Sequence, residues 1–320
     1  MNNTYYVATY ATSPSFNQWN PQIESQYFKQ LAAQQEIIGI EHPFLLQSDK
    51  YNLEWLKDNL PSHWSIIVTA LPVFMILSKD NPSLGLASSH EHERIMAVKI
   101  MEKIANYTKK LNHLFERRIV NAVHLHAFPR NDNTAVRGNK VALKQSLHDL
   151  KNIDFDGAAL NIEHCDSYRS EHAPEKGFLS LEDEIEIIHA TGGYGIILNL
   201  GRSAIEHRST MGPLSHINMA KQANLLKGFF FSGCTSSPQS DYGAWKDTHM
   251  PPKNFTNSPY LSADSLLGQD EIKNVFSLLE KEHYLGVKVL DTSPNKTLDR
   301  SVGLNISTIH ALEKGNEQLK

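Results

Sequence analysis

The stretch GYGIILNLGRSAIEHR, residues 193–208, contains the unit from which this chain is built. An apolar run rich in isoleucine and leucine predicts a buried strand that ends at Asn199, and Arg202 follows three residues later. Polar side chains at the end of such a strand lie where α/β proteins build their sites. The chemistry of Asn199 and Arg202 is therefore the first question that this sequence raises.

Seven more short runs of this kind occur along the chain, and helical patterns lie between them. They begin at Tyr5, Ile37, Trp64, Val120, Gly157, Gly228 and Leu285. Eight alternating strand and helix units predict a single (β/α)8 TIM barrel over residues 1–320. The alternative is a doubly wound open sheet, which the number of runs disfavours, and no GxGxxG or P-loop motif follows any run.

The helical segments carry their own signals. Residues 92–111 place apolar side chains at the spacing of one helix face. Ser180 precedes an acidic first turn, which predicts a helix N-cap, and Gly192 and Gly193 predict the end of the same helix.

Composition narrows the function classes. The 320 residues are 40% hydrophobic and 21% charged, with a net charge of −4, as in ordinary globular proteins. The chain lacks the cation clusters that phosphate backbones need and the long apolar runs that bilayers need, so we expect no nucleic-acid or membrane partner. Its beginning lacks a signal-peptide pattern, and Cys165 and Cys234 lack metal-type spacing. These features predict free thiols and a cytoplasmic location.

Strand periodicity predicts which side chains face the barrel axis, because alternate residues of a strand point to opposite faces. In the run from Gly157, Asn161 and Glu163 would face inward and His164 outward. Further inward positions are expected at Glu41, His124, His126, Asn199, Val287, Val289 and Asp291. The polar members converge at the carboxyl ends of strands, so Glu41, His124 and Asn199 are expected to bind substrate.

Two of the inward residues are carboxylates that suit catalysis. Glu163 and Asp291 at one barrel mouth would repel each other unless they hold a cation or work as an acid and a base. His126 lies nearer the mouth than His124 and is the expected proton carrier. The alternative is that each carboxylate pairs with a nearby lysine or arginine.

A long segment after the seventh run, at about residues 233–268, is expected to be a binding loop. It carries Trp245, which would stack on a sugar ring or anchor the loop, and the metal-ligand types Asp247 and His249 in Asp-x-His spacing. Arg169, after the fifth run, would bind an anionic group of the substrate or remain solvated.

The short motifs together resemble the xylose isomerase-like TIM barrels, which include sugar isomerases, sugar epimerases and AP endonucleases. The resemblance covers most of the barrel. IIGIEHPF is similar to the strand-2 motif of that superfamily, VHLHAFP to its strand-4 region, LNIEHCDS to its strand-5 metal-binding glutamate, and KVLDTSP to its strand-8 motif. The resemblance implies metal ligation by Glu163 and Asp291, and WKDTHMPP implies Asp247 and His249 as further ligands.

The sequence departs from this superfamily at its metal site. The strand-6 Asp-x-x-His motif is replaced here by Asn199 and Arg202, and the strand-7 histidine is lost, with Phe231 in its expected place. Asparagine is a feeble ligand, phenylalanine cannot ligate, and the permanent charge of arginine repels a metal. We therefore expect either one divalent ion, Zn, Mn or Mg, or none.

These departures lead to the hypothesis that Arg202 is a built-in cation which pairs with Asp247 or with an anionic substrate. The protein is then expected to be an isomerase- or epimerase-like enzyme that moves protons on a small sugar or sugar acid. The alternatives are a carbohydrate lyase or hydrolase and a sugar-binding barrel without catalysis. AP endonuclease activity is disfavoured because the ligand set is broken. Assembly into a homo-oligomer stays open.

Overall fold

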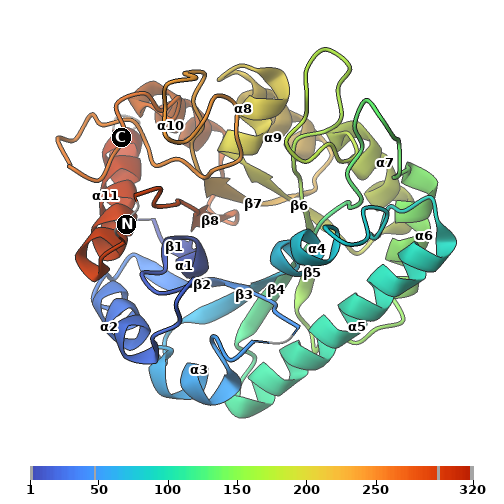
Figure 1. Cartoon of the computed structure of the whole chain (residues 1–320), viewed down its shortest axis with the longest axis horizontal. Coiled ribbons are helices and arrows are strands. Elements are labelled where there is room, and N and C mark those ends of the chain that lie inside the picture. Colours follow the sequence, from blue (N-terminus) through green and yellow to red (C-terminus); the bar gives the residue numbers. More distant parts are fainter. Residues whose placement is uncertain (1–2, 47, 294–295, 318–320) are drawn as a thin grey trace.

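The chain folds as one closed barrel of eight parallel strands with helices around the outside (Figure 1). The computed structural model describes residues 3–46, 48–293 and 296–317. The strands are β1 Tyr5–Val7, β2 Ile37–Pro43, β3 Ser65–Thr69, β4 Val120–Leu125, β5 Ala159–Glu163, β6 Gly195–Asn199, β7 Leu226–Phe231 and β8 Tyr284–Val287. Each strand pairs in parallel with its neighbours in sequence, and β1 closes the barrel against β8. The prediction of a TIM barrel is confirmed.

The helices cover the strands in chain order. They are α1 Thr9–Thr12, α2 Pro21–Ala32, α3 Leu53–Asn59, α4 Leu71–Leu77, α5 Glu91–Leu114, α6 Lys140–Leu150, α7 Leu181–Thr191, α8 Leu200–His207, α9 Gly212–Gln222, α10 Gln269–Leu278 and α11 Leu298–Glu317. Ser180 caps α7 by accepting from the N–H of Asp183, and Gly192 ends it at φ 72°, both as the sequence predicts.

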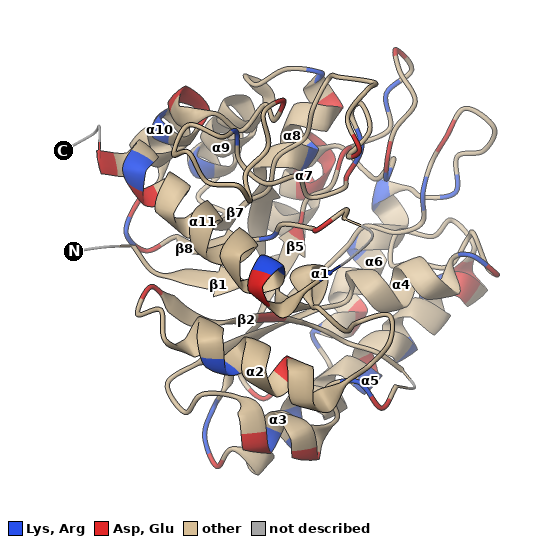
Figure 2. Ribbon diagram, turned by 60° about the vertical axis from the view of Figure 1, so that its left-hand side comes forward, with Lys and Arg blue, Asp and Glu red and all other residues tan. Residues whose placement is uncertain are grey.

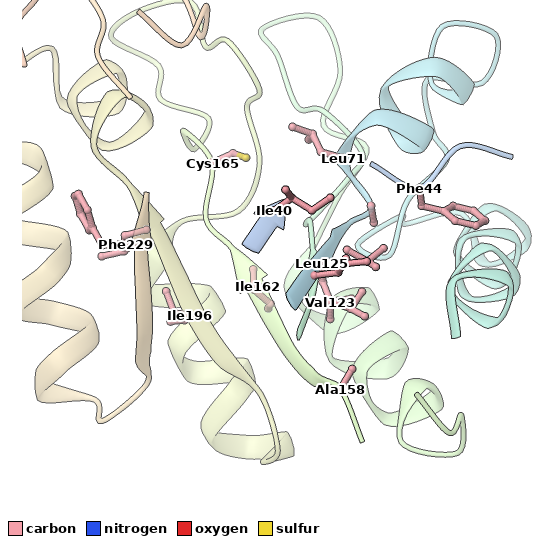
Figure 3. Packing of buried hydrophobic residues seen from close by; sticks show 14 of the residues in the cluster. Ile40, Phe44, Leu71, Val123, Leu125, Ala158, Ile162, Cys165, Ile196 and Phe229 are labelled. Atoms are coloured by element: carbon pink, nitrogen blue, oxygen red, sulfur yellow. The ribbon is translucent and has the colours of Figure 1, made fainter. Parts of the chain in front are cut away.

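The main hydrophobic core lies between the strands and the helices. Val123, Ile162, Ile196 and Phe229 point outward from β4, β5, β6 and β7 into this layer (Figure 3). A smaller apolar cluster fills the lower barrel interior, and it contains Tyr6, Ile67, Ala122, Ile197 and Phe230. The interior at the carboxyl ends of the strands, called the upper end here, is polar. One end of the barrel interior is therefore apolar and the other is polar.

The predicted alternation is wrong at the end of β8 and in the two residues that follow it. Val287 and Val289 face the helices within the outer core, and Lys288 between them is fully buried inside the barrel. The prediction assumed that the apolar residues of this run face the axis. Around Lys288 the barrel interior is charged, so the two valines pack in the outer core instead.

None of the described helices is long and apolar enough to span a bilayer. Lysine, arginine, aspartate and glutamate alternate over the helices and loops, so blue and red segments are interspersed around the molecule (Figure 2).

Candidate functional site

Three buried carboxylates meet at the upper end of the barrel. Glu41 lies two residues before the end of β2, Glu163 ends β5, and Asp247 comes from the segment between β7 and α10. Three cations neutralise them: Lys288, Arg202 and Lys176. Burying charges is tolerated only with such close pairing, so these residues form one balanced ionic network.

Lys288 lies between two of the carboxylates. Its Nζ is 3.1 Å from Glu41 Oε1, 3.0 Å from Glu41 Oε2 and 3.3 Å from Glu163 Oε1. Burial alone would lower the pKa of Lys288, but the charges of Glu163 and Glu41 outweigh it and raise that pKa. The sequence analysis missed this residue. The signal was a lone lysine inside the apolar run LGVKVL.

Arg202, on the first turn of α8, points into the barrel and is fully buried. Its Nη1 donates to Glu163 Oε1, and its Nε donates to Asp247 Oδ2 at 3.2 Å. Lys176 Nζ lies 2.9 Å from the same Asp247 oxygen. Burial opposes ionisation of Glu163, but Arg202 and Lys288 hold its pKa well below the usual range. The expected pairing of Arg202 with Asp247 is present in the structure, while its chemical role stays a prediction.

Asn199 positions Arg202. Its Oδ1 accepts from the backbone N–H of Arg202 at 3.2 Å and thereby caps α8, and Ser232 Oγ donates to the same oxygen at 2.7 Å. Asn199 was expected to bind substrate, and its Nδ2 has no hydrogen-bond partner among the described residues. The residue thus combines a structural role with one unused buried donor.

His126 and His124 both contact the carboxylates. His126 Nε2 lies 2.8 Å from Glu163 Oε2, while His126 Nδ1 has no partner within the described part of the chain. Burial lowers the pKa of His126 to about 4, so the ring is neutral at pH 7. His124 Nδ1 lies 3.3 Å from Glu41 Oε1, and its Nε2 lies 2.9 Å from the hydroxyl of Tyr284.

His249 lies beside Asp247, with 3.2 Å between His249 Nδ1 and Asp247 Oδ1. Burial lowers the pKa of His249 to about 4. On the opposite side of the site, the hydroxyl of Tyr10 donates to Glu41 Oε2 at 3.1 Å. Asp247 therefore belongs to the ionic network, with the neutral ring of His249 beside it, and the selection of both as metal ligands stays a prediction.

Asp291 does not join this network. It lies four residues beyond the end of β8, and Arg300 Nε on α11 donates to it at 2.8 Å. The alternation rule applies within a strand and does not reach so far past its end. The expectation of an inward Asp291 paired with Glu163 is wrong in this geometry, and Glu41 is the second carboxylate, bridged to Glu163 by Lys288.

Three other selected residues lie elsewhere. Arg169 Nη2 donates to Glu206 on α8 at 2.7 Å, outside the barrel. Trp245 packs near α8, where the Arg208 guanidinium lies 5.3 Å from its ring, so it anchors the loop. Phe231 stacks on Phe276 of α10 in the outer core, so it does not stand at an inward position.

Two groups of buried histidine and acidic side chains have the donor types of a metal site. One consists of Glu41, His124 and Glu163 in the barrel, and the other of His164, Glu206 and His216. In the barrel group the ammonium of Lys288 already lies 3.0–3.3 Å from both carboxylates. A divalent ion held by those oxygens would have to displace that ammonium, so the barrel group does not fit the metal that the resemblance implies.

Comparisons with known proteins agree with this fold. An uncharacterised protein of Salmonella typhimurium is 32% identical over 320 residues, 99% of this chain and 99% of its own length. A crystal structure of D-psicose 3-epimerase in the presence of D-fructose matches with a TM-score of 0.53 and 13% identity, over 99% of this chain and 96% of that one. A xylose isomerase-like TIM barrel protein from Mycobacterium smegmatis, in complex with magnesium, matches with a TM-score of 0.55 and 10% identity, over 99% and 98%.

The fold is thus that of the xylose isomerase-like TIM barrels, as the sequence motifs suggested. A family model described as a domain of unknown function, DUF4862, matches residues 6–304. Because this match covers almost the whole barrel, from β1 to α11, the chain belongs to the DUF4862 family.

Proposed function

We propose that this protein binds a small sugar acid at the barrel mouth and transfers a proton on it by isomerase- or epimerase-like chemistry, without a metal at that site. The observation that carries the proposal is a pair of unused buried donors, Arg202 Nη2 and Asn199 Nδ2. Neither finds an acceptor among the described residues. An unsatisfied buried donor costs roughly 1–3 kcal/mol, and an oxygen of a ligand would remove that cost.

Arg202 would act on the substrate as an electrophile. A carbonyl or carboxylate oxygen that accepts from Arg202 Nη2 and Asn199 Nδ2 becomes polarised, and the neighbouring C–H becomes more acidic. The guanidinium does not have to move, because Glu163 and Asp247 already hold it. Such preorganised charge is the usual source of stabilisation for a developing oxyanion.

His126 would be the general base. Since Glu163 is ionised, its Oε2 accepts a hydrogen bond and His126 Nε2 carries the proton, which leaves a lone pair on Nδ1. Glu163 would then stabilise the imidazolium that forms, as the carboxylate does in other His–carboxylate pairs. Burial is the main cause of the lowered pKa of His126, and Arg202 and Lys288 lower it further. The negative charge of an anionic substrate would offset these two cations and make His126 a stronger base.

A neighbouring cavity supports an anionic substrate. It has a volume of about 270 Å³ and shares Lys176 with the ionic network. Its charged lining residues are Lys79, Arg130, Arg137 and Lys176, against Asp132 and Glu175. The cavity is slightly smaller than the roughly 300–1,000 Å³ of pockets for drug-sized ligands, so it suits a small molecule. The D-psicose 3-epimerase with a similar fold also acts on a small sugar.

The test uses chelator-treated protein in D₂O with a panel of sugar acids and the matching neutral sugars. Proton transfer exchanges the hydrogen next to the carbonyl for deuterium, which NMR detects as loss of a substrate signal. We expect exchange with at least one sugar acid, and we expect His126→Asn and Arg202→Gln to lower the rate by at least about 100-fold.

Three outcomes would contradict the proposal, or one part of it, in different ways. Exchange that needs added Mn²⁺ or Mg²⁺ would refute the metal-independent mechanism. Saturable binding of a sugar acid with no exchange, lyase product or hydrolysis product would make the protein a sugar-binding barrel. Unchanged exchange in His126→Asn would remove His126 as the base.

A further inference from the structure

A second polar cluster lies outside the barrel, between the end of β5 and helices α7, α8 and α9. We call the four residues His164, Glu206, His207 and His216 the outer histidine cluster. His164, Glu206 and His216 are buried, and His207 is exposed at the surface of α8. From this geometry we infer that the outer histidine cluster is a binding site for a zinc ion, independent of the barrel site.

The distances between the donor atoms match a tetrahedral site. With bonds of about 2.1 Å, adjacent ligand atoms of a zinc tetrahedron lie about 3.4 Å apart. Here His207 Nε2 lies 2.9 Å from His216 Nε2, His164 Nε2 lies 3.1 Å from Glu206 Oε2, and His216 Nε2 lies 3.8 Å from Glu206 Oε1. The first two distances are slightly shorter than the expected value, and the third joins His216 to the other oxygen of Glu206. Ligand atoms of His164, Glu206 and His216 all lie within 4.8 Å of one another, and His207 approaches this group through His216.

The second nitrogens of the two buried histidines are held as in known metal sites. His164 Nδ1 lies 2.8 Å from Glu184 on α7, and His216 Nδ1 lies 2.9 Å from Ser203 Oγ on α8. Metal-binding histidines usually have such an outer partner, which fixes the ring and directs the other nitrogen at the ion. His164 Nε2 accordingly lies close to Glu206, and His216 Nε2 lies close to both Glu206 and His207.

Glu206 keeps one oxygen suited to an ion. Arg169 and the hydroxyl of Ser167 donate to Oε1, each at 2.7 Å, whereas Oε2 receives the backbone N–H of Ser167 at 2.9 Å and contacts His164. Zinc at Oε2 would replace only the His164 contact. A set of three histidines and one carboxylate is a donor set that zinc prefers, and the exposed His207 gives the ion a route from solvent.

The alternative is that a proton on His164, and not a metal ion, holds this cluster together. In this state His164 carries a proton and bridges Glu184 to Glu206, with no ion bound. Both states hold β5 to α7 and α8, so stability alone does not distinguish them. A direct measurement of metal binding distinguishes the two states.

The experiment is equilibrium dialysis of full-length, chelator-treated protein against Zn²⁺, followed by elemental analysis, with Co²⁺ as an optical probe of tetrahedral coordination. We expect about one Zn²⁺ per chain and a visible Co²⁺ spectrum of tetrahedral type. His207 is exposed, so the variant His207→Ala should fold normally. Loss of a partner that only orients a ligand weakens metal binding roughly 10- to 100-fold, and we expect loss of His207 to weaken zinc binding at least as much. His216→Ala should do the same.

The controls separate this site from the barrel and from ordinary surface histidines. His92→Ala removes an exposed histidine of α5, and Glu41→Gln removes a carboxylate of the barrel; we expect both to bind zinc as the unmodified protein does. No stoichiometric binding would refute the inference. Binding that survives His207→Ala but is lost in Glu41→Gln would also refute it, and would place the metal in the barrel, against the proposed metal-independent function as well.

Discussion

At the scale of single residues, the chemistry of this barrel depends on two cations that stand among carboxylates. Arg202 and Lys288 both contact Glu163, and neither has solvent exposure. Together with Lys176 they balance the three negative charges of the site. In the proposed function, these side chains would supply the positive charge that a bound metal would otherwise bring.

Replacing Lys288 tests this balance. In Lys288→Met the carboxylates of Glu41 and Glu163 lose their shared cation and remain buried. We expect the free energy of unfolding to fall by about 3–5 kcal/mol, because a buried charge without its partner is that costly. Urea denaturation measures the change. Lys281→Met, at an exposed position, is the matched control and should change the value by about 0.5 kcal/mol or less. A similarly small change in Lys288→Met would show that Glu41 and Glu163 do not need the ammonium.

At the scale of the elements, α8 carries the site because its N-terminus coincides with the end of β6. Asn199 both ends the strand and caps the helix, which fixes where Arg202 leaves the backbone. Because the strand leads directly into the helix, the spacing of three residues between Asn199 and Arg202 fixes the direction of the Arg202 side chain.

The cap provides a second prediction. Asn199→Ala should lower the free energy of unfolding by about 1 kcal/mol through loss of the cap, and should also weaken binding of the substrate by removing a donor and loosening Arg202. Ser180→Ala removes an equivalent cap from α7, where the Ser180 hydroxyl accepts from the N–H of Asp183 and bonds no member of the ionic network among the described residues. It should cost a similar stability and leave ligand binding unchanged. Calorimetry of both variants with the same sugar acid measures the difference, and equal binding would contradict a ligand contact by Asn199.

The loop after β7 provides a third prediction. Trp245 lies over Arg208 and beside Ala204 and Ile205 of α8, so its ring fastens the segment that carries Asp247. Trp245→Ala should make residues 232–268 more sensitive to limited proteolysis, while the rest of the barrel stays resistant. An unchanged digestion pattern would show that other contacts, such as that of Lys246 with Glu175 at 2.7 Å, are enough to hold the loop.

The elements were more predictable than their interior contacts. Alternating strand and helix patterns led to the barrel, and the alternation in β5 placed Glu163 correctly, because its apolar residues face the helices and its polar ones face the axis. The same rule failed at the end of β8, because Lys288, the residue after the strand, is inward, while the valines on either side of it face the helices. Asp291 was misplaced because its partner Arg300 is on α11, and a sequence pattern does not reveal contacts between distant segments.

At the scale of the whole molecule, the buried histidines make stability depend on pH on both sides of neutrality. Burial lowers the pKa of His126 and His249 to about 4, and of His42 and His216 to about 3. His164 is the opposite case. Burial alone would lower its pKa, but the adjacent carboxylates of Glu184 and Glu206 raise it to about 10.

The signs of these shifts predict the shape of the pH profile in chelator-treated protein. The unfolded chain protonates its histidines near pH 6.5, whereas His126 and His249 in the folded chain do not do so until about pH 4. Stability should therefore fall by several kcal/mol as the pH drops from about 6.5 to 4. The lowered pKa values of Glu163 and Asp247 extend the loss to lower pH, below the ordinary values of about 4.

On the alkaline side the folded chain keeps the proton of His164 up to about pH 10, while the unfolded chain releases it near pH 6.5, so stability should also fall between these values. Urea denaturation at a series of pH values should thus give a maximum close to pH 6.5. His164→Gln should flatten the alkaline side and leave the acid side in place, because His126 and His249 still titrate there. An alkaline side that keeps its slope in His164→Gln would assign that loss to other groups, and would mean that Glu184 and Glu206 do not hold a proton between them.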